Sequence, residues 1–123
     1  MKKSIVYLGL ALIAFTNVSF ASNLNFLTNS IEIYEGVSPL NIAISKGDIE
    51  SVKKFIEYGV DVNEVSNKMT PLMVAARYNK VEIIKILVSK GAVVNAKDEN
   101  GFTALKYAEL SNANEAVLFL KQM

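Results

Sequence analysis

Residues 70–80 read TPLMVAARYNK, and two other stretches of the chain read almost the same. SPLNIAISKGD begins 32 residues earlier, at residue 38, and TALKYAELSNA begins 33 residues later, at residue 103. A near-constant period of this length is typical of a solenoid, in which each unit packs on its neighbours to complete a core. The three copies therefore predict a stack of three units.

The apolar positions recur with the same period. A leucine stands near the start of each copy, an alanine follows it by three residues, and two further apolar positions come later. A recurrence of this kind marks the side chains that neighbouring units share as their core. The matched columns are Leu40, Leu72 and Leu105; Ala43, Ala75 and Ala108; Val52, Ile84 and Val117; and Phe55, Leu87 and Leu120.

Each copy predicts two helices joined by a short polar turn. Ser38 and Thr70 can cap the first helix with their hydroxyls, and the proline that follows each of them suits a first helical turn. The second helix has apolar residues at helical spacing and a glutamate in its first turn, such as Glu82, where the helix dipole favours an anion. Gly59 and Gly91 are expected to end it, because glycine adopts the left-handed conformation readily.

The pattern T-P-L-x-x-A, followed by an amphipathic stretch such as VEIIKILVSKGAVVN and then by NAKDENGFTAL, resembles the ankyrin repeat. The resemblance implies an all-α fold, an ankyrin-repeat solenoid of stacked helix-turn-helix units with hairpin loops. It divides the chain into an N-terminal cap segment at 22–37, repeat 1 at 38–69, repeat 2 at 70–102, and a truncated repeat 3 at 103–123 that forms the C-terminal cap.

The sequence departs from the ankyrin pattern at three places, one of which, Ala104 in place of the proline of repeat 3, a helix start tolerates. The residue after T-P-L is usually a histidine that bonds the threonine hydroxyl and links repeats, and here it is Asn41, Met73 or Lys106. Only Asn41 is expected to keep a hydrogen-bonding role, so we expect a less rigid stack. The loop between repeats 1 and 2 is one residue short, and Lys68 replaces the turn glycine found at Gly101. Because a positive φ is costly for lysine, we expect this loop to take another shape.

The composition excludes the commonest kinds of catalysis. The 123-residue chain contains no cysteine and no histidine, so it lacks the commonest general base and the commonest transition-metal ligand. It has no glycine-rich phosphate loop and no cluster with metal-ligand spacing, and the pair Asp98–Glu99 is best explained as a solvated loop tip. We therefore expect no enzyme activity, no cofactor and no metal site.

The charge of the chain argues against a nucleic-acid partner. The formal net charge is +1, but Lys2 and Lys3 lie in the first segment. The remaining eleven basic residues face twelve acidic ones and are scattered along the sequence. We expect no nucleic-acid binding, because nothing forms the basic stripe that phosphate contacts require.

Residues 1–21, MKKSIVYLGLALIAFTNVSFA, have the pattern of a secretory signal peptide. Lys2 and Lys3 precede an uncharged apolar run, and Ser19 and Ala21 place small residues before a cleavage point between Ala21 and Ser22. The run is short of the roughly 20 apolar residues of a membrane span. We expect cleavage, export from a bacterial cell to the periplasm or the medium, and no stable membrane insertion. The alternative is an uncleaved membrane anchor.

The resemblance places the binding surface on the concave face that hairpin tips and first helices form. The residues before the three helix caps, Val37, Met69 and Phe102, are apolar and in register, and Arg77 and Tyr78 end the first helix of repeat 2. Aromatic residues, Met and Arg are enriched at interfaces, although the three apolar residues can instead pack on neighbouring hairpins. The candidate partner-binding residues are Tyr34, Val37, Lys46, Asn67, Met69, Arg77, Tyr78, Asn100 and Phe102.

We therefore predict a monomeric, non-catalytic protein–protein interaction module that binds one protein of the bacterial envelope through its concave face. Two alternatives use the same surface. One is a secreted effector that binds a host protein, and the other is a membrane-tethered interaction module. The sequence does not identify the partner.

Overall fold

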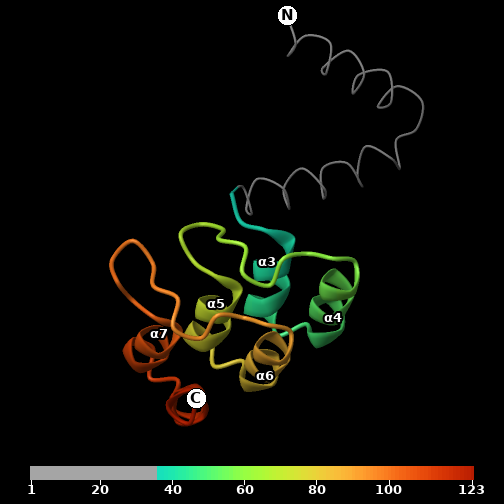
Figure 1. The fold of residues 1–123 in the computed structure, drawn as a ribbon. Helices are drawn as coiled ribbons and strands as arrows, with labels where there is room; N and C mark the ends of the chain where they lie inside the picture. The colour runs from blue at the N-terminus through green and yellow to red at the C-terminus, as the bar shows by residue number, and fades with distance from the viewer. Residues whose placement is uncertain (1–35) are drawn as a thin grey trace, which may run out of the picture. The chain divides into compact units, whose positions relative to one another are not determined.

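The computed structural model describes residues 36–123, and this part of the chain forms six helices and no strand. The helices make three consecutive pairs, each pair joined by a short turn and separated from the next by a longer loop (Figure 1). They are α3 (Pro39–Lys46), α4 (Ile49–Glu57), α5 (Pro71–Arg77), α6 (Val81–Ser89), α7 (Ala104–Leu110) and α8 (Asn114–Lys121).

The helices lie in two rows. Figure 1 shows α3, α5 and α7 side by side in the inner row and α4, α6 and the last helix in the outer row. The loops that lead from α4 to α5 and from α6 to α7 both project beyond the inner row on the same side (Figure 1). We call these the first hairpin loop (residues 58–70) and the second hairpin loop (residues 90–103). The predicted all-α stack of helix pairs is confirmed.

Each inner helix begins at the predicted hydroxyl cap. Ser38 Oγ accepts a hydrogen bond from the backbone N–H of the residue three positions later at 3.2 Å. Thr70 Oγ1 and Thr103 Oγ1 do the same at 3.2 and 3.3 Å. Each oxygen satisfies one of the N–H groups that a helix start leaves without an intrahelical acceptor.

The outer helices α4 and α6 end at glycines, as predicted. Gly59 and Gly91 have φ of 94° and 97°, a region that favours glycine. At the end of α4, the N–H of Gly59 donates to the carbonyl of Ile56 and the N–H of Val60 donates to the carbonyl of Phe55, both at 3.0 Å. The same pair of reverse bonds surrounds Gly91, so both helices end in a Schellman motif.

The repeating columns that the sequence shows supply much of the core, although Phe55, Leu105 and Val117 are only partly buried. The first leucine of repeats 1 and 2 is 1% exposed, and the alanines three residues later are between 0% and 6% exposed. Such small side chains allow neighbouring inner helices to approach closely. α5 occupies the middle of the stack and contacts α3, α6 and α7, so its buried face joins repeat 2 to both neighbouring repeats.

Two asparagines join neighbouring repeats through the backbone. The side chain of Asn63 donates to the carbonyl of Gly91 at 3.1 Å and accepts from the N–H of Val93 at 2.9 Å. Asn79 Oδ1, on the turn between α5 and α6, accepts from the N–H of Ala116 at 3.0 Å. Ala116 is the third residue of α8, whose N-cap residue, Ala113, provides no side-chain cap. Repeat 2 thus supplies the cap for a helix of repeat 3.

The first hairpin loop corrects our expectation for Lys68. Asn67 and Lys68 have φ of 51° and 66°, and Ser66 and Met69 exchange two backbone hydrogen bonds across them. A two-residue hairpin requires positive φ at both central residues in its type I′ form, so Lys68 adopts the conformation that we expected it to avoid. The two hairpin loops differ here because the first is one residue shorter. The second loop has a three-residue turn at 99–101, in which Gly101 alone has positive φ.

Two further expectations concern hydrogen bonds and the N-terminal segment. Asn41 was expected to keep a hydrogen-bonding role, but among the described residues neither polar atom of its side chain has a partner. Our predictions for the signal peptide, for Ala21 and Ser22, and for Tyr34 fall outside the described residues. Within 36–123, no helix has the length and apolar character that a bilayer crossing requires.

Candidate protein-binding face

The second hairpin loop is fastened to α7 by a polar and aromatic cluster. Tyr107 OH donates to Asp98 Oδ2, and Asp98 Oδ1 accepts from the N–H groups of Asn100 and Phe102, both at 2.9 Å. The Phe102 ring meets the Tyr107 ring edge-on, with centroids 5.9 Å apart and planes at 79°. The loop is therefore held in one position against the inner row.

Asp98 is thus a structural anchor, which corrects our description of residues 98–99 as a solvated loop tip. The Tyr107 hydroxyl is the main cause that lowers the pKa of Asp98, and the two backbone N–H groups add to it. The same hydrogen bond is the main cause that raises the pKa of Tyr107, with burial second. Glu99 does remain exposed, and its carboxylate lies 3.6 Å from Lys68 Nζ on the first hairpin loop.

Arg77 and Tyr78 stand together at the end of α5. The guanidinium carbon of Arg77 lies 5.7 Å from the centroid of the Tyr78 ring, and both side chains are exposed. Among the described residues Arg77 has no carboxylate within ion-pairing distance. Its charge also acts on the pKa of Tyr107, which it lowers, so α5 and α7 bring these two side chains near each other. The arrangement leaves a positioned guanidinium open to a partner.

The three apolar residues before the helix caps have different surroundings. Val37, Met69 and Phe102 are all half-buried, and Met69 packs against the core. Phe102 contacts Tyr107, as described above. Part of each side chain is thus buried, as expected if these residues pack on neighbouring hairpins, and part stays accessible to a partner.

The predicted loop-tip residues lie where a partner can reach them. Asn67 and Asn100 are exposed at the tips of the first and second hairpin loops. The structure therefore brings Phe102 and Asn100 into one cluster with Tyr107, and Arg77 with Tyr78. Tyr107 was missed from the sequence. Tyr107 occupies the position that Ile42 and Val74 fill in repeats 1 and 2. An aromatic ring where the other repeats have an aliphatic side chain was the available signal.

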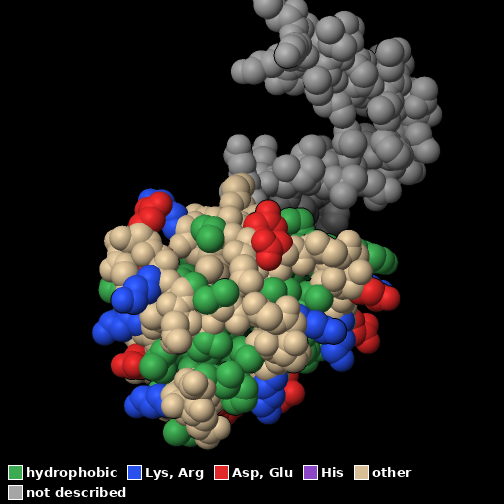
Figure 2. Space-filling view, in the orientation of Figure 1, with side chains coloured by type: hydrophobic (Ala, Val, Ile, Leu, Met, Phe, Trp, Pro, Cys, Tyr) green, Lys and Arg blue, Asp and Glu red, His purple; other side chains and the backbone are tan. Residues whose placement is uncertain are grey.

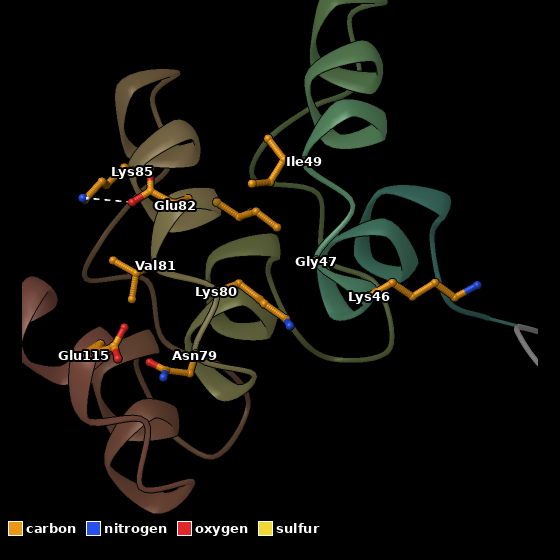
Figure 3. A pocket seen from close by; sticks show the side chains of 10 residues that line it. Lys46, Gly47, Ile49, Asn79, Lys80, Val81, Glu82, Lys85 and Glu115 are labelled. Carbon is orange, nitrogen blue, oxygen red and sulfur yellow. Dashed lines mark hydrogen bonds and ion pairs between the residues drawn. The ribbon is translucent and has the colours of Figure 1, made fainter.

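Lys46 belongs to a different place, a groove at the turns between inner and outer helices. The groove has a volume of about 500 Å³ and includes Lys46, Gly47, Ile49, Lys80 and Glu115. Figure 3 shows Lys80 reaching toward Gly47 while Lys46 points away from Lys80. A Cβ at Gly47 would lie only 3.1 Å from Lys80 Nζ. The groove is amphipathic, since lysines and glutamates surround apolar side chains.

The remaining surface carries charges of both signs. Figure 2 shows lysine and arginine side chains mixed with acidic ones around the described residues, with no continuous basic stripe on this face. Residues 36–123 contain no group of three acidic, histidine or cysteine side chains placed to hold a metal ion. The two groups, Phe102 with Tyr107 and Arg77 with Tyr78, can offer apolar contact area, hydrogen bonds and one guanidinium, which suits recognition of another chain.

Comparison with known proteins agrees with the fold. A sequence profile of ankyrin repeats (3 copies) matches residues 11–98 and 40–123. Human ankyrin repeat and SOCS box protein 11 is 32% identical over 100 residues, which are 78% of this chain and 31% of that protein. Human transient receptor potential cation channel subfamily A member 1 is 37% identical over 87 residues, which are 69% of this chain and 8% of the channel.

A bacterial relative is the phosphocholine transferase AnkX of Legionella pneumophila, which is 36% identical over 74 residues. These residues are 58% of this chain and 8% of AnkX. The chain thus spans less than a third of the length of each of these relatives. Ankyrin repeats are protein–protein interaction modules and are generally non-catalytic. The profile covers far more than half of the sequence, and the chain belongs to the ankyrin-repeat family.

Proposed function

We propose that this protein is a non-catalytic module that binds one protein partner through the face formed by the hairpin loops and the inner helices. The observation that carries the proposal is the cluster of Phe102, Tyr107, Arg77 and Tyr78, which places three aromatic rings and an arginine on adjacent repeats. These residue types dominate binding energy at interfaces. The proposed module acts as a monomer and uses neither a nucleic acid nor a cofactor.

The chemistry of the face also favours a kind of partner segment. Arg77 is stacked on Tyr78 and has no carboxylate partner among the described residues. A guanidinium fixed in this way binds a carboxylate with two parallel hydrogen bonds at little entropic cost. A segment that carries Asp or Glu beside an apolar side chain would therefore complement both Arg77 and the exposed edge of Phe102.

The test measures binding and stability on the same variants. We expect Tyr78→Ser and Phe102→Ser each to weaken partner binding by roughly 1–4 kcal/mol, the range of interface hot spots. Tyr78 is 48% exposed, so its loss should change the thermal midpoint little, whereas Met69→Ser should lower it, because Met69 packs on the core. The controls are Lys54→Ala and Lys85→Ala on exposed positions of the outer helices. Equal affinity in the Tyr78 variant and the controls would place the interface elsewhere.

We further propose that the protein is exported from a bacterial cell and acts in the periplasm or outside the cell. The support is the sequence pattern of residues 1–21 alone, and the ankyrin profile itself begins at residue 11, inside that segment. The intact mass of the recovered protein should correspond to a chain that begins at Ser22. Recovery from the culture medium would favour the secreted effector, and a full-length chain held in the membrane would favour the tethered module.

A further inference from the structure

One buried polar group stands out in repeat 1. Asn41 is 2% exposed, and among the described residues neither its Oδ1 nor its Nδ2 has a hydrogen-bond partner. Buried amide groups are nearly always paired, because burial without a partner costs the full desolvation of the group. An unpaired buried asparagine therefore calls for a physical explanation.

The equivalent position in repeat 2 shows what a side chain does there. Met73 is the third residue of α5, and its sulfur accepts a hydrogen bond from the N–H of Thr70 at 3.5 Å. The Thr70 hydroxyl in turn accepts from the N–H of Met73. This is the reciprocal arrangement of a capping box, in which the third helical residue binds the N–H of the cap residue.

Repeat 1 has only half of that arrangement. Ser38 Oγ accepts from the N–H of Asn41, but the N–H of Ser38 does not donate to the Asn41 side chain. It donates instead to Ser66 Oγ at 2.6 Å, across a separation of 28 residues. The Ser66 hydroxyl also donates to the carbonyl of Gly36 at 3.3 Å. A residue of the first hairpin loop thus binds the N–H group that, in repeat 2, the third helical residue binds.

We propose that the N–H of Ser38 switches between two acceptors, Ser66 Oγ and Asn41 Oδ1, and that this switch docks and releases the first hairpin loop. In the docked state the Ser66 hydroxyl bridges residues 36 and 38, and the amide of Asn41 is left unpaired. In the released state Asn41 completes the capping box of α3, and Ser66 turns to water. The docked state makes two hydrogen bonds through Ser66, whereas the released state makes one and gives the buried Asn41 Oδ1 a partner, so the two states are close in free energy.

The switch also moves a residue of the candidate binding face. Met69 exchanges two backbone hydrogen bonds with Ser66, at 3.0 and 3.1 Å, so the two residues move together. A partner that contacts Met69 would bind the docked state and shift the population toward it. This consequence rests on the proposed function, whereas the switch itself does not.

The experiment follows amide hydrogen exchange of Ser38 by NMR in the purified protein and in Ser66→Ala, Asn41→Leu and the double variant. In each single variant one acceptor remains, so the Ser38 amide should stay protected. In the double variant both acceptors are gone, and its exchange should accelerate on the order of tenfold, the effect expected for one lost hydrogen bond. The amides of Ser66 and Met69 should exchange faster in Ser66→Ala and more slowly in Asn41→Leu.

Repeat 2 supplies the matched control. Met73→Leu keeps an apolar side chain of similar size but removes the acceptor for Thr70, so only the Thr70 amide should lose protection. The proposal is overturned if Ser66→Ala alone exposes the Ser38 amide as fully as Met73→Leu exposes that of Thr70, because Asn41 then offers no second acceptor. It is also overturned if Ser38 stays protected in the double variant. The first of these comparisons needs no double variant and still decides the matter if that variant fails to fold.

Partner affinity separates this inference from the proposed function. With any partner identified for the protein, Asn41→Leu should tighten binding and Ser66→Ala should weaken it, since the two changes shift the loop in opposite directions. If the exchange rates follow the prediction and both affinities stay unchanged, the switch stands and the role of Met69 in binding is refuted.

Discussion

Asn79 offers the sharpest test of how the repeats are joined. Its Oδ1 lies 3.0 Å from the N–H of Ala116 and caps a helix in the next repeat, while its own backbone has φ of 57°. Asn79→Ala removes the cap and also places alanine in the left-handed region. Asn79→Gly removes only the cap, because glycine adopts positive φ freely.

The two variants should therefore differ by a defined amount. Loss of a side-chain cap costs about 1 kcal/mol, and the left-handed conformation costs a residue with a Cβ about 1–2 kcal/mol. We expect Asn79→Gly to lower the free energy of unfolding by about 1 kcal/mol and Asn79→Ala by about 2–3 kcal/mol. In a domain of this size, 1 kcal/mol corresponds to roughly 4–8 °C in thermal midpoint.

The assay combines thermal melts followed by circular dichroism with amide exchange of Ala116. Exchange of Ala116 should accelerate in both variants, while its neighbours beyond the first turn of α8 change little. Gly47 is the equivalent residue in repeat 1, with φ of 72°, and the helix start it faces, that of α6, has no side-chain cap. Gly47→Asn should install the missing cap, worth about 1 kcal/mol, and only the flexible end of Lys80 must move; because asparagine at φ of 72° carries a small cost, stability should rise by less than the full value of the cap. An unchanged Ala116 amide in Asn79→Gly would refute the capping role.

Three further predictions concern packing, pH and the first hairpin loop. Leu72 is 1% exposed in the central helix, so Leu72→Ala should cost about 2–5 kcal/mol in chemical denaturation, and a midpoint within a degree or two of the parent would show that the packing is misassigned. The lowered pKa of Asp98 stabilises the fold at pH values above about 4, the ordinary pKa of this carboxyl, and this stability is lost as the pH falls through the folded pKa. The raised pKa of Tyr107 stabilises the fold below about pH 10, and this stability is lost as the pH rises through the folded pKa. Tyr107→Phe should flatten both ends of the stability–pH curve, and an unaltered curve would contradict the anchor. Lys68→Gly should stabilise by up to about 1 kcal/mol by relieving positive φ, since the exposed pair with Glu99 contributes little, and a destabilised variant in urea titration would reverse this reasoning.

Much of the fold could be predicted from the sequence, because the same physical signals occur three times. The leucine and alanine columns, the hydroxyl caps and the helix-ending glycines each act locally or between adjacent repeats, so their period carries the information. The conformation of Lys68 could not be predicted from residue preference. The short loop forces two residues into positive φ, and loop length outweighs the preference of lysine.

The candidate site was predictable only in part. Arg77 and Tyr78 follow from their place at the end of a helix, which periodicity defines. The contact of Asp98 with Tyr107 joins a loop to a helix nine residues away, and the cap that Asn79 provides joins two repeats 37 residues apart. The first depends on Tyr107, whose counterparts are Ile42 and Val74, and the second on an acceptor that repeat 1 lacks at Gly47, so the period alone does not predict either contact.

We propose that the protein binds its partner by the face of hairpin loops and inner helices, and crosslinking can locate that face. The most direct measurement is site-specific photocrosslinking in cells that make the protein, with the crosslinking residue at Tyr78 or Phe102 and, as controls, at the exposed outer-helix positions Lys85 and Leu118. We expect one discrete crosslinked protein from positions 78 and 102 and none from the two controls. A product that forms from positions 85 and 118 but not from 78 and 102 would contradict this proposal.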